Sequence, residues 1–171
     1  KMIRSFFSSA LVLLCTALVE TAVFSNITSL PAIPDLSLIC VLYLSLSNGK
    51  LLGETTGFVS GLFLDFLSAG PFGLNCLLRT IIGYLGGMFN KLLNTEGFFI
   101  PLVLGLCTTL VKGILLWIIS MLYPSSVILP YSPFTFQFLF ELGINSILTP
   151  FVFRFLHLFK NSLIIGPEST I

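Results

Sequence analysis

Six ionisable residues lie inside long apolar runs of this 171-residue chain, and their side-chain types are the ones that could support chemistry. A charged group at the middle of a bilayer is unfavourable by roughly 3 kcal/mol or more, so such residues usually face a partner of opposite charge or a cavity. The chemistry to consider is therefore ion pairing, proton transfer or solute binding. The six residues are Glu20, Glu54, Asp65, Arg79, Lys112 and Glu141.

Helical spacing predicts one ion pair in the first half of the chain. Glu54 and Asp65 are three helical turns apart and share one face, whereas Asn75 and Arg79 are one turn apart on the next apolar run. If the turn between these runs centres near Gly70, antiparallel pairing places Asn75 level with Asp65 and Arg79 about one turn deeper. We therefore predict an Asp65–Arg79 pair with Asn75 assisting.

The same reasoning predicts a second pair in the second half of the chain. Across the connection 123–134, Lys112 falls within about one turn of Glu141, and Asn145 lies on the same helical face as Glu141. Two interpretations of both pairs stay open, a structural one that fixes the fold and a functional one that binds a proton or solute. Loss of one partner of a buried pair costs about 3–5 kcal/mol under either interpretation.

The residues that catalysis or metal binding would need are sparse. The chain contains one histidine, His157, next to the basic residues Arg154 and Lys160, and it contains no HExxH or P-loop pattern. Each of the four cysteines stands alone in an apolar run, without a CxxC pair. We expect a protein that is not an enzyme and that uses no metal and no cofactor.

Composition identifies the environment of these residues as a lipid bilayer. Hydrophobic residues make up 56% of the chain and charged residues 9%, with a mean hydropathy of +1.06 and a net charge of +1, whereas about 25% of residues are charged in soluble domains. No run of Lys and Arg could hold a nucleic acid. Segments in lipid must satisfy their own backbone hydrogen bonds, so helices are expected.

Six apolar stretches predict an all-α integral membrane protein, with residues 1–171 forming a single transmembrane domain. The second and third stretches are short for a bilayer that requires about 20 residues, and one of them could instead be re-entrant. The predicted spans are approximately 6–24, 35–48, 51–67, 73–90, 98–122 and 135–158.

Basic residues predict the orientation of the chain. With six spans, no Lys or Arg falls in the connections 25–34, 68–72 and 123–134, which instead carry prolines. Positive residues favour the cytoplasmic side, so both termini are predicted to be cytoplasmic. The basic residues on that side are Lys1, Arg4, Lys50, Lys91 and Lys160.

Glycines recur every four residues on the third and fourth spans. They are Gly53, Gly57 and Gly61 on the third, and Gly83 and Gly87 on the fourth. Small residues allow helix backbones to approach closely in a membrane. With a turn near residue 70, we expect Gly57 to lie near Gly83 and Gly53 near Gly87.

A motif in the middle of the chain, within residues 34–87, resembles the signature of the bacterial rod shape-determining protein MreD family. Length, hydropathy and six spans extend the similarity to the rest of the chain. The motif residues are Pro34, Asp35, Gly57, Gly61, Leu62, Asp65, Ser68, Pro71, Gly73, Asn75, Gly83 and Tyr84.

This resemblance implies an inner-membrane, non-catalytic subunit of the cell-elongation complex that synthesises side-wall peptidoglycan. Its implied partners are MreC, a RodA-type glycosyltransferase, a penicillin-binding transpeptidase and, indirectly, the MreB filament. An Asp65–Arg79 lock would then hold the loop from Ser68 to Pro71 as a fixed surface for a periplasmic partner.

The resemblance also implies a specific fold and, with it, an alternative function. The family is thought to share the six-helix fold of the substrate-binding subunits of energy-coupling-factor transporters. The alternative is therefore a membrane subunit that binds a small solute such as a vitamin, contacted by Asp65, Asn75 and Arg79.

Overall fold

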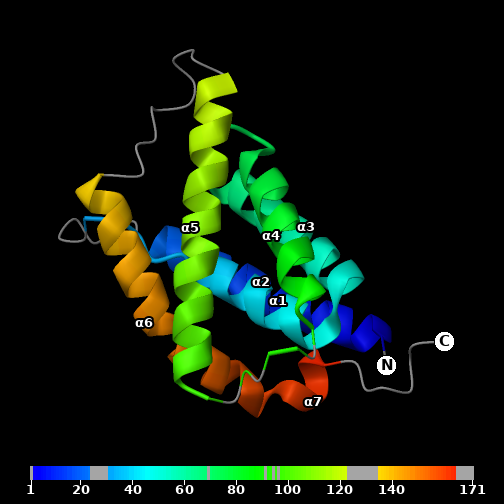
Figure 1. Ribbon diagram of the computed structural model, residues 1–171. Helices are drawn as coiled ribbons and strands as arrows, with labels where there is room; N and C mark the ends of the chain where they lie inside the picture. The colour runs from blue at the N-terminus through cyan, green and yellow to red at the C-terminus, as the bar shows by residue number, and fades with distance from the viewer. Residues whose placement is uncertain are drawn as a thin grey trace.

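The computed structural model describes residues 2–23, 31–68, 70–90, 92–93, 95, 97–122 and 135–164, with side chains from Ser5 onward. These residues form helices and no strand (Figure 1). A helix lies at each of the six predicted spans, and a short seventh helix follows them. The helices are α1 (Met2–Ala22), α2 (Leu36–Asn48), α3 (Lys50–Leu67), α4 (Leu74–Met88), α5 (Phe99–Leu122), α6 (Phe136–Leu158) and α7 (Lys160–Leu163).

Helix α2 is the central element of the protein. Every residue from Ser37 to Leu46 is buried, and α1, α3, α4 and α6 all contact this helix. A helix that is apolar around its whole circumference is suited to such a position. Its Tyr43 ring packs edge-on against Phe153 of α6, with the ring centroids 5.2 Å apart. Helix α2 is therefore short but enclosed by its neighbours from Ser37 to Leu46.

Helices α3 and α4 form a tight hairpin whose backbones touch. A Cβ atom on Gly53 would collide with the carbonyl oxygen of Gly83, and one on Gly83 would collide with the Gly53 carbonyl. Gly57 lies against the backbone of Arg79, and Gly87 lies against Lys50. Small residues therefore set the distance between these two helices.

The predicted register of this hairpin is wrong by one helical turn. Gly53 faces Gly83 instead of Gly87, and Gly57 faces Arg79 instead of Gly83. The turn does not centre on residue 70, because backbone amides at the start of α4 donate hydrogen bonds to the side chain of Asp65. This contact places the midpoint of the hairpin closer to the end of α3.

Helices α5 and α6 pack together and supply two of the longest apolar segments. Gly105 lies against Thr149, and Gly113 lies against the ring of Phe138. Three helical segments of the described chain are long and apolar enough to cross a membrane, namely Ser5–Ala22, Phe99–Leu122 and Phe136–Leu158. Helix α2 is apolar but shorter.

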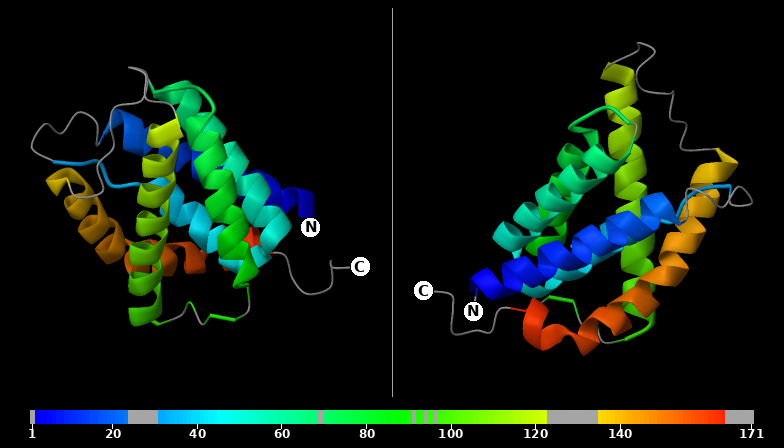
Figure 2. Two further views of the ribbon diagram at one scale, coloured as in Figure 1. Left: turned by 45° about the horizontal axis from the view of Figure 1, so that its top comes forward. Right: turned by 180° about the vertical axis from the view of Figure 1, so that it is seen from behind.

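The start of α1, the α2–α3 junction and α7 meet at one end of the molecule (Figure 2). The hydroxyl of Ser5 donates a hydrogen bond to the carbonyl oxygen of Leu163 at 2.7 Å, and the Asn48 side-chain amide donates to the same oxygen at 3.0 Å. Lys50 and Lys160 begin α3 and α7 at this end. Lys1, Lys91 and the connections 24–30 and 123–134 lie outside the described residues.

Candidate functional site: a buried ion network at the start of α2

Asp35 stands at the centre of a polar cluster inside the helix bundle. It is the N-cap of α2, where its Oδ1 accepts a hydrogen bond from the backbone N–H of Leu38 at 3.1 Å. Aspartate is favoured at this position because it satisfies one of the free amides of a helix N-terminus. The residue is only 3% exposed, and the preceding Pro34 is also buried. Helix α2 therefore begins within the protein interior.

Arg79 reaches Asp35 from α4. Its Nη2 forms an ion pair with Asp35 Oδ1, while its Nη1 donates hydrogen bonds to Ser37 Oγ at 2.7 Å and to Ser60 Oγ at 3.0 Å. The guanidinium is 3% exposed. Its fixed fork of donors allows one side chain to join α2, α3 and α4.

A second carboxylate, Glu20 of α1, also lies near the Arg79 guanidinium. Its Oε1 is 3.9 Å from Arg79 Nη2, and its Oε2 accepts a hydrogen bond from the Ser37 hydroxyl at 2.7 Å. The Ser37 hydroxyl thus donates to Glu20 while accepting from Arg79. This relay connects α1 to the cluster.

Lys112 connects the cluster to α5 and α6. Its Nζ lies 2.7 Å from Asp35 Oδ2 and 2.6 Å from Glu141 Oε1. The structure therefore brings the expected partners Lys112 and Glu141 together and adds Asp35 to them. Asn145 Oδ1 accepts from the backbone N–H of Asp35 at 2.9 Å, and Asn145 Nδ2 donates to Thr109 Oγ1 at 3.3 Å.

Three carboxylates and two cations thus meet where each of the helices α1 to α6 contributes a polar side chain. Buried ions require both a counter-charge and hydrogen bonds to offset the loss of hydration, and both are present here. We call this cluster the ion network. Its residues are Glu20, Asp35, Ser37, Ser60, Arg79, Thr109, Lys112, Glu141 and Asn145.

The predicted Asp65–Arg79 pair does not form. The Asp65 carboxylate instead accepts hydrogen bonds from the backbone amides of Gly73, Asn75 and Cys76 at 2.9–3.1 Å, and from the Asn75 side chain at 3.0 Å. The free amides at the start of α4 satisfy this carboxylate fully, which leaves Arg79 available to Asp35. Asn75 therefore forms the expected hydrogen bond to Asp65, but Arg79 takes no part in this contact.

Other motif residues shape the α3–α4 turn. Gly73, the N-cap of α4, has a φ of +92°, a left-handed conformation that favours glycine. The amide of Leu74 donates to the carbonyl of Pro71 at 3.3 Å. At the end of α3, the amide of Ser68 donates to the carbonyl of Leu64 at 2.7 Å. Tyr84 lies outside the network on the exposed face of α4.

Sequence reasoning assigned no partner to Asp35 or Glu20. A signal for Asp35 was present, because an aspartate directly after a proline and before an apolar run is typical of a helix N-cap. Ser37, Ser60 and Thr109 are ordinary residues in apolar helices, and only their positions in space reveal their role. Among the described residues, no group of three or more His, Cys, Asp and Glu is arranged to hold a metal ion.

The fold and the ion network define a helical membrane protein in which buried charges from several helices are paired with one another. A comparison with protein families matches residues 1–159 to the family described as rod shape-determining protein MreD. The chain belongs to this family. Searches of curated proteins and of solved structures gave no significant match. Family membership and the three long apolar helices indicate an inner-membrane protein related to rod shape.

Proposed function

We propose that this protein is a non-catalytic scaffold of the cell-elongation complex. It would hold MreC, a RodA-type glycosyltransferase and a penicillin-binding transpeptidase in register in the inner membrane, with the MreB filament acting indirectly. The observation that carries the proposal is the MreD family match over residues 1–159. A scaffold needs a rigid shape more than a reactive group, and the pairing within the ion network is suited to that need.

The ion network contributes to this function by acting as a clamp between helices. Asp35 joins Arg79 of α4 to Lys112 of α5, and Lys112 joins Asp35 to Glu141 of α6. If one helix moved by a turn, at least one buried charge would lose its partner, at a cost of about 3–5 kcal/mol. The outer helix faces would therefore be presented to partners in one arrangement.

The proposal includes six membrane crossings with both termini in the cytoplasm. Helices α2, α3 and α4 are short, but α2 is enclosed by its neighbours and α3 and α4 pair along their glycines. The hydrogen bonds from Ser5 and Asn48 to Leu163 bring the start of α1 and α7 to the side where Lys50 and Lys160 lie. This clustering supports a common cytoplasmic side.

No observation favours the solute-binding alternative. Asp65 and Asn75 are engaged at the start of α4, and Arg79 is buried among Asp35, Ser37 and Ser60. A vitamin site at these residues would need polar atoms directed into a cavity, whereas these atoms are bonded to other protein groups. We therefore retain the scaffold proposal alone.

The test is depletion of the native protein in its own cells, followed by complementation and affinity purification in mild detergent. The wild-type protein should restore rod shape and recover MreC together with the wall-synthesis pair. Asp35→Asn, at matched membrane abundance, should lose both properties. Purification with a transmembrane coupling subunit and two ATPases, without MreC, would refute the scaffold role.

A further inference from the structure

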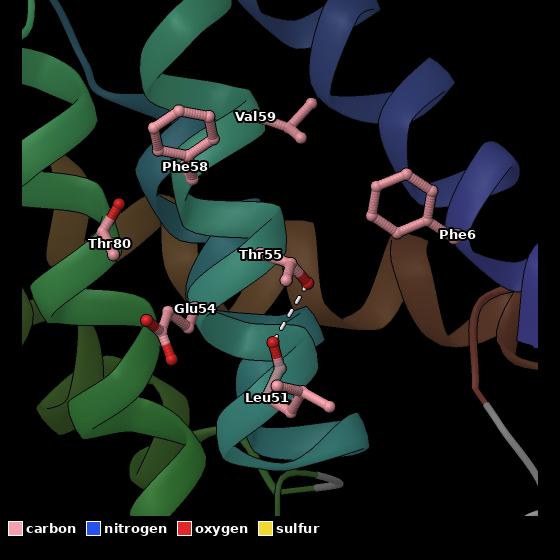
Figure 3. Close-up of a pocket in the computed structure, with 7 residues that line it drawn as sticks. All are labelled: Phe6, Leu51, Glu54, Thr55, Phe58, Val59 and Thr80. Atoms are coloured by element: carbon pink, nitrogen blue, oxygen red, sulfur yellow. Dashed lines mark hydrogen bonds between the residues drawn. The ribbon is translucent and has the colours of Figure 1, made fainter.

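An open groove follows the outer face of α3, between α1 and α4 (Figure 3). Its volume is about 440 Å³. Leu51 and Phe58, which line it, are 75% and 51% exposed. In Figure 3, Phe6 of α1 borders one side, while Glu54 and Thr80 lie on the side of α4. The lining residues are Phe6, Leu51, Glu54, Thr55, Phe58, Val59 and Thr80.

Glu54 is the one carboxylate of the described chain that forms no hydrogen bond or ion pair. Glu20, Asp35 and Glu141 belong to the ion network, and Asp65 caps α4. Lys50 lies one turn before Glu54 on α3, and the structure, which describes both residues, shows no ion pair between them. A carboxylate on an apolar helix face that lies in a membrane is unfavourable unless a counter-charge reaches it.

The other polar groups of the groove can only accept hydrogen bonds. The Thr55 hydroxyl donates to the carbonyl of Leu51 at 3.0 Å, and the Thr80 hydroxyl donates to the carbonyl of Cys76 at 2.6 Å. Both hydroxyl protons are thus used, and only oxygen lone pairs face outward. Among the side chains that the structure describes, no cation lines the groove. The complementary ligand is therefore a cationic donor with apolar flanks.

The apolar face extends well beyond Glu54. Leu51, Phe58 and Phe66 project on the same side of α3, and all three are exposed. From Leu51 to Phe66 this face is about 22 Å long at 1.5 Å per residue, most of the thickness of a bilayer core. That length matches a helix rather than a lipid headgroup. A headgroup amine would also bring a phosphate, for which the described lining residues offer no donor.

We propose that this groove is the docking site for a transmembrane helix of a partner protein, and that a Lys or Arg of that helix pairs with Glu54. The inference rests on the proposed scaffold function and names the surface that would carry it. The partner helix packs its apolar side chains along α3, and its cation occupies the space beside Glu54, Thr55 and Thr80. Polar bonds of this kind supply specificity between helices in lipid, where apolar contact alone gives little.

The experiment places the photo-crosslinking amino acid p-benzoylphenylalanine at position 58 in the full chain and irradiates native membranes. The matched control carries it at Ile114 on α5, which is 53% exposed. Each is combined with wild-type Glu54, Glu54→Asp, Glu54→Gln or Glu54→Arg. Elution in detergent as a single monodisperse species verifies that the variants fold, and mass spectrometry identifies the crosslinked peptides.

We expect position 58 to crosslink to an apolar helix of another protein that carries Lys or Arg within one turn of the crosslinked residue. Glu54→Gln should lower the yield roughly three- to twentyfold, Glu54→Arg should abolish it, and Glu54→Asp should retain most of it. Changing the partner's cation to Glu should restore the yield with Glu54→Arg. Position 114 should not respond to any change at Glu54.

Four outcomes would overturn the inference: no crosslink at position 58, a yield insensitive to Glu54→Arg, a lipid adduct, or crosslinking to a second copy of this chain. Recovery of MreC with the wild-type protein is scored separately. If MreC is recovered but the crosslink ignores Glu54, the scaffold proposal survives and the groove assignment fails. If the Glu54-dependent crosslink identifies a helix outside the cell-elongation proteins, the groove assignment survives and the scaffold proposal fails.

Discussion

Replacing Asp35 by asparagine separates its charge from its role as a helix cap. Asparagine retains an oxygen that can accept from the Leu38 amide, but it brings an NH₂ group toward the cations Arg79 and Lys112. Donor would then face donor in a buried site. Breaking a buried pair on one side costs about 3–5 kcal/mol. Because Lys112 keeps Glu141 and Arg79 keeps two serine hydroxyls, we expect about 3 kcal/mol, the lower end of this range.

Two further variants calibrate this value. Asp35→Ala also removes the cap, which should add about 1 kcal/mol. Glu141→Gln removes a carboxylate that is 12% exposed, and Lys112 still retains Asp35. This change should cost about 1–2 kcal/mol, between the values for exposed and buried pairs. The expected order of damage is therefore Asp35→Ala, then Asp35→Asn, then Glu141→Gln.

The assay is reversible unfolding in mixed micelles by titration with dodecyl sulfate. Trp117, the single tryptophan of the chain, reports the transition by fluorescence, and helicity is measured in parallel. A double-mutant cycle between Asp35→Asn and Lys112→Met isolates the coupling of this pair. If Asp35→Asn unfolds at the wild-type midpoint, or if Glu141→Gln is the more damaging change, Asp35 is not the centre of the network.

Two further predictions concern the α3–α4 hairpin. Gly53→Ala and Gly83→Ala should each lower the free energy of unfolding by about 1–3 kcal/mol, because the added methyl groups force the two backbones apart. The control is Gly97→Ala, where a Cβ atom has open space, and it should leave the thermal midpoint in detergent unchanged. The exchange Asp65→Arg with Arg79→Asp should not restore stability lost in the single variants, because these residues have different partners; rescue by the double variant in the same assay would contradict the observed contacts.

The helices could be predicted from sequence because a lipid bilayer imposes simple requirements. Apolar runs bounded by polar residues located the helices α1 to α6, since a backbone in lipid must form its own hydrogen bonds. The contact between Lys112 and Glu141 also followed from sequence. These residues lie on helices joined directly by the connection 123–134, so counting turns was sufficient.

The centre of the ion network could not be derived in this way. Asp35 meets Arg79 and Lys112 across 44 and 77 residues of chain, and no local spacing encodes such a contact. The Asp65–Arg79 pair was predicted from opposite charge and from a hairpin register centred near residue 70, which is wrong by one helical turn. Backbone amides at the start of α4 were the competing donors, and helical periodicity does not reveal which donor is closer.

The order of charges along the chain has a consequence for biosynthesis. Glu20 and Asp35 are translated first, whereas Arg79 and Lys112 are supplied later, by α4 and α5. A nascent chain that ends after α2 therefore carries two carboxylates without the cations that pair with them in the folded protein, an unfavourable state in lipid. We therefore expect a fragment truncated between α2 and α4 to be less stable in membranes than the full chain, because its network carboxylates lack their partners.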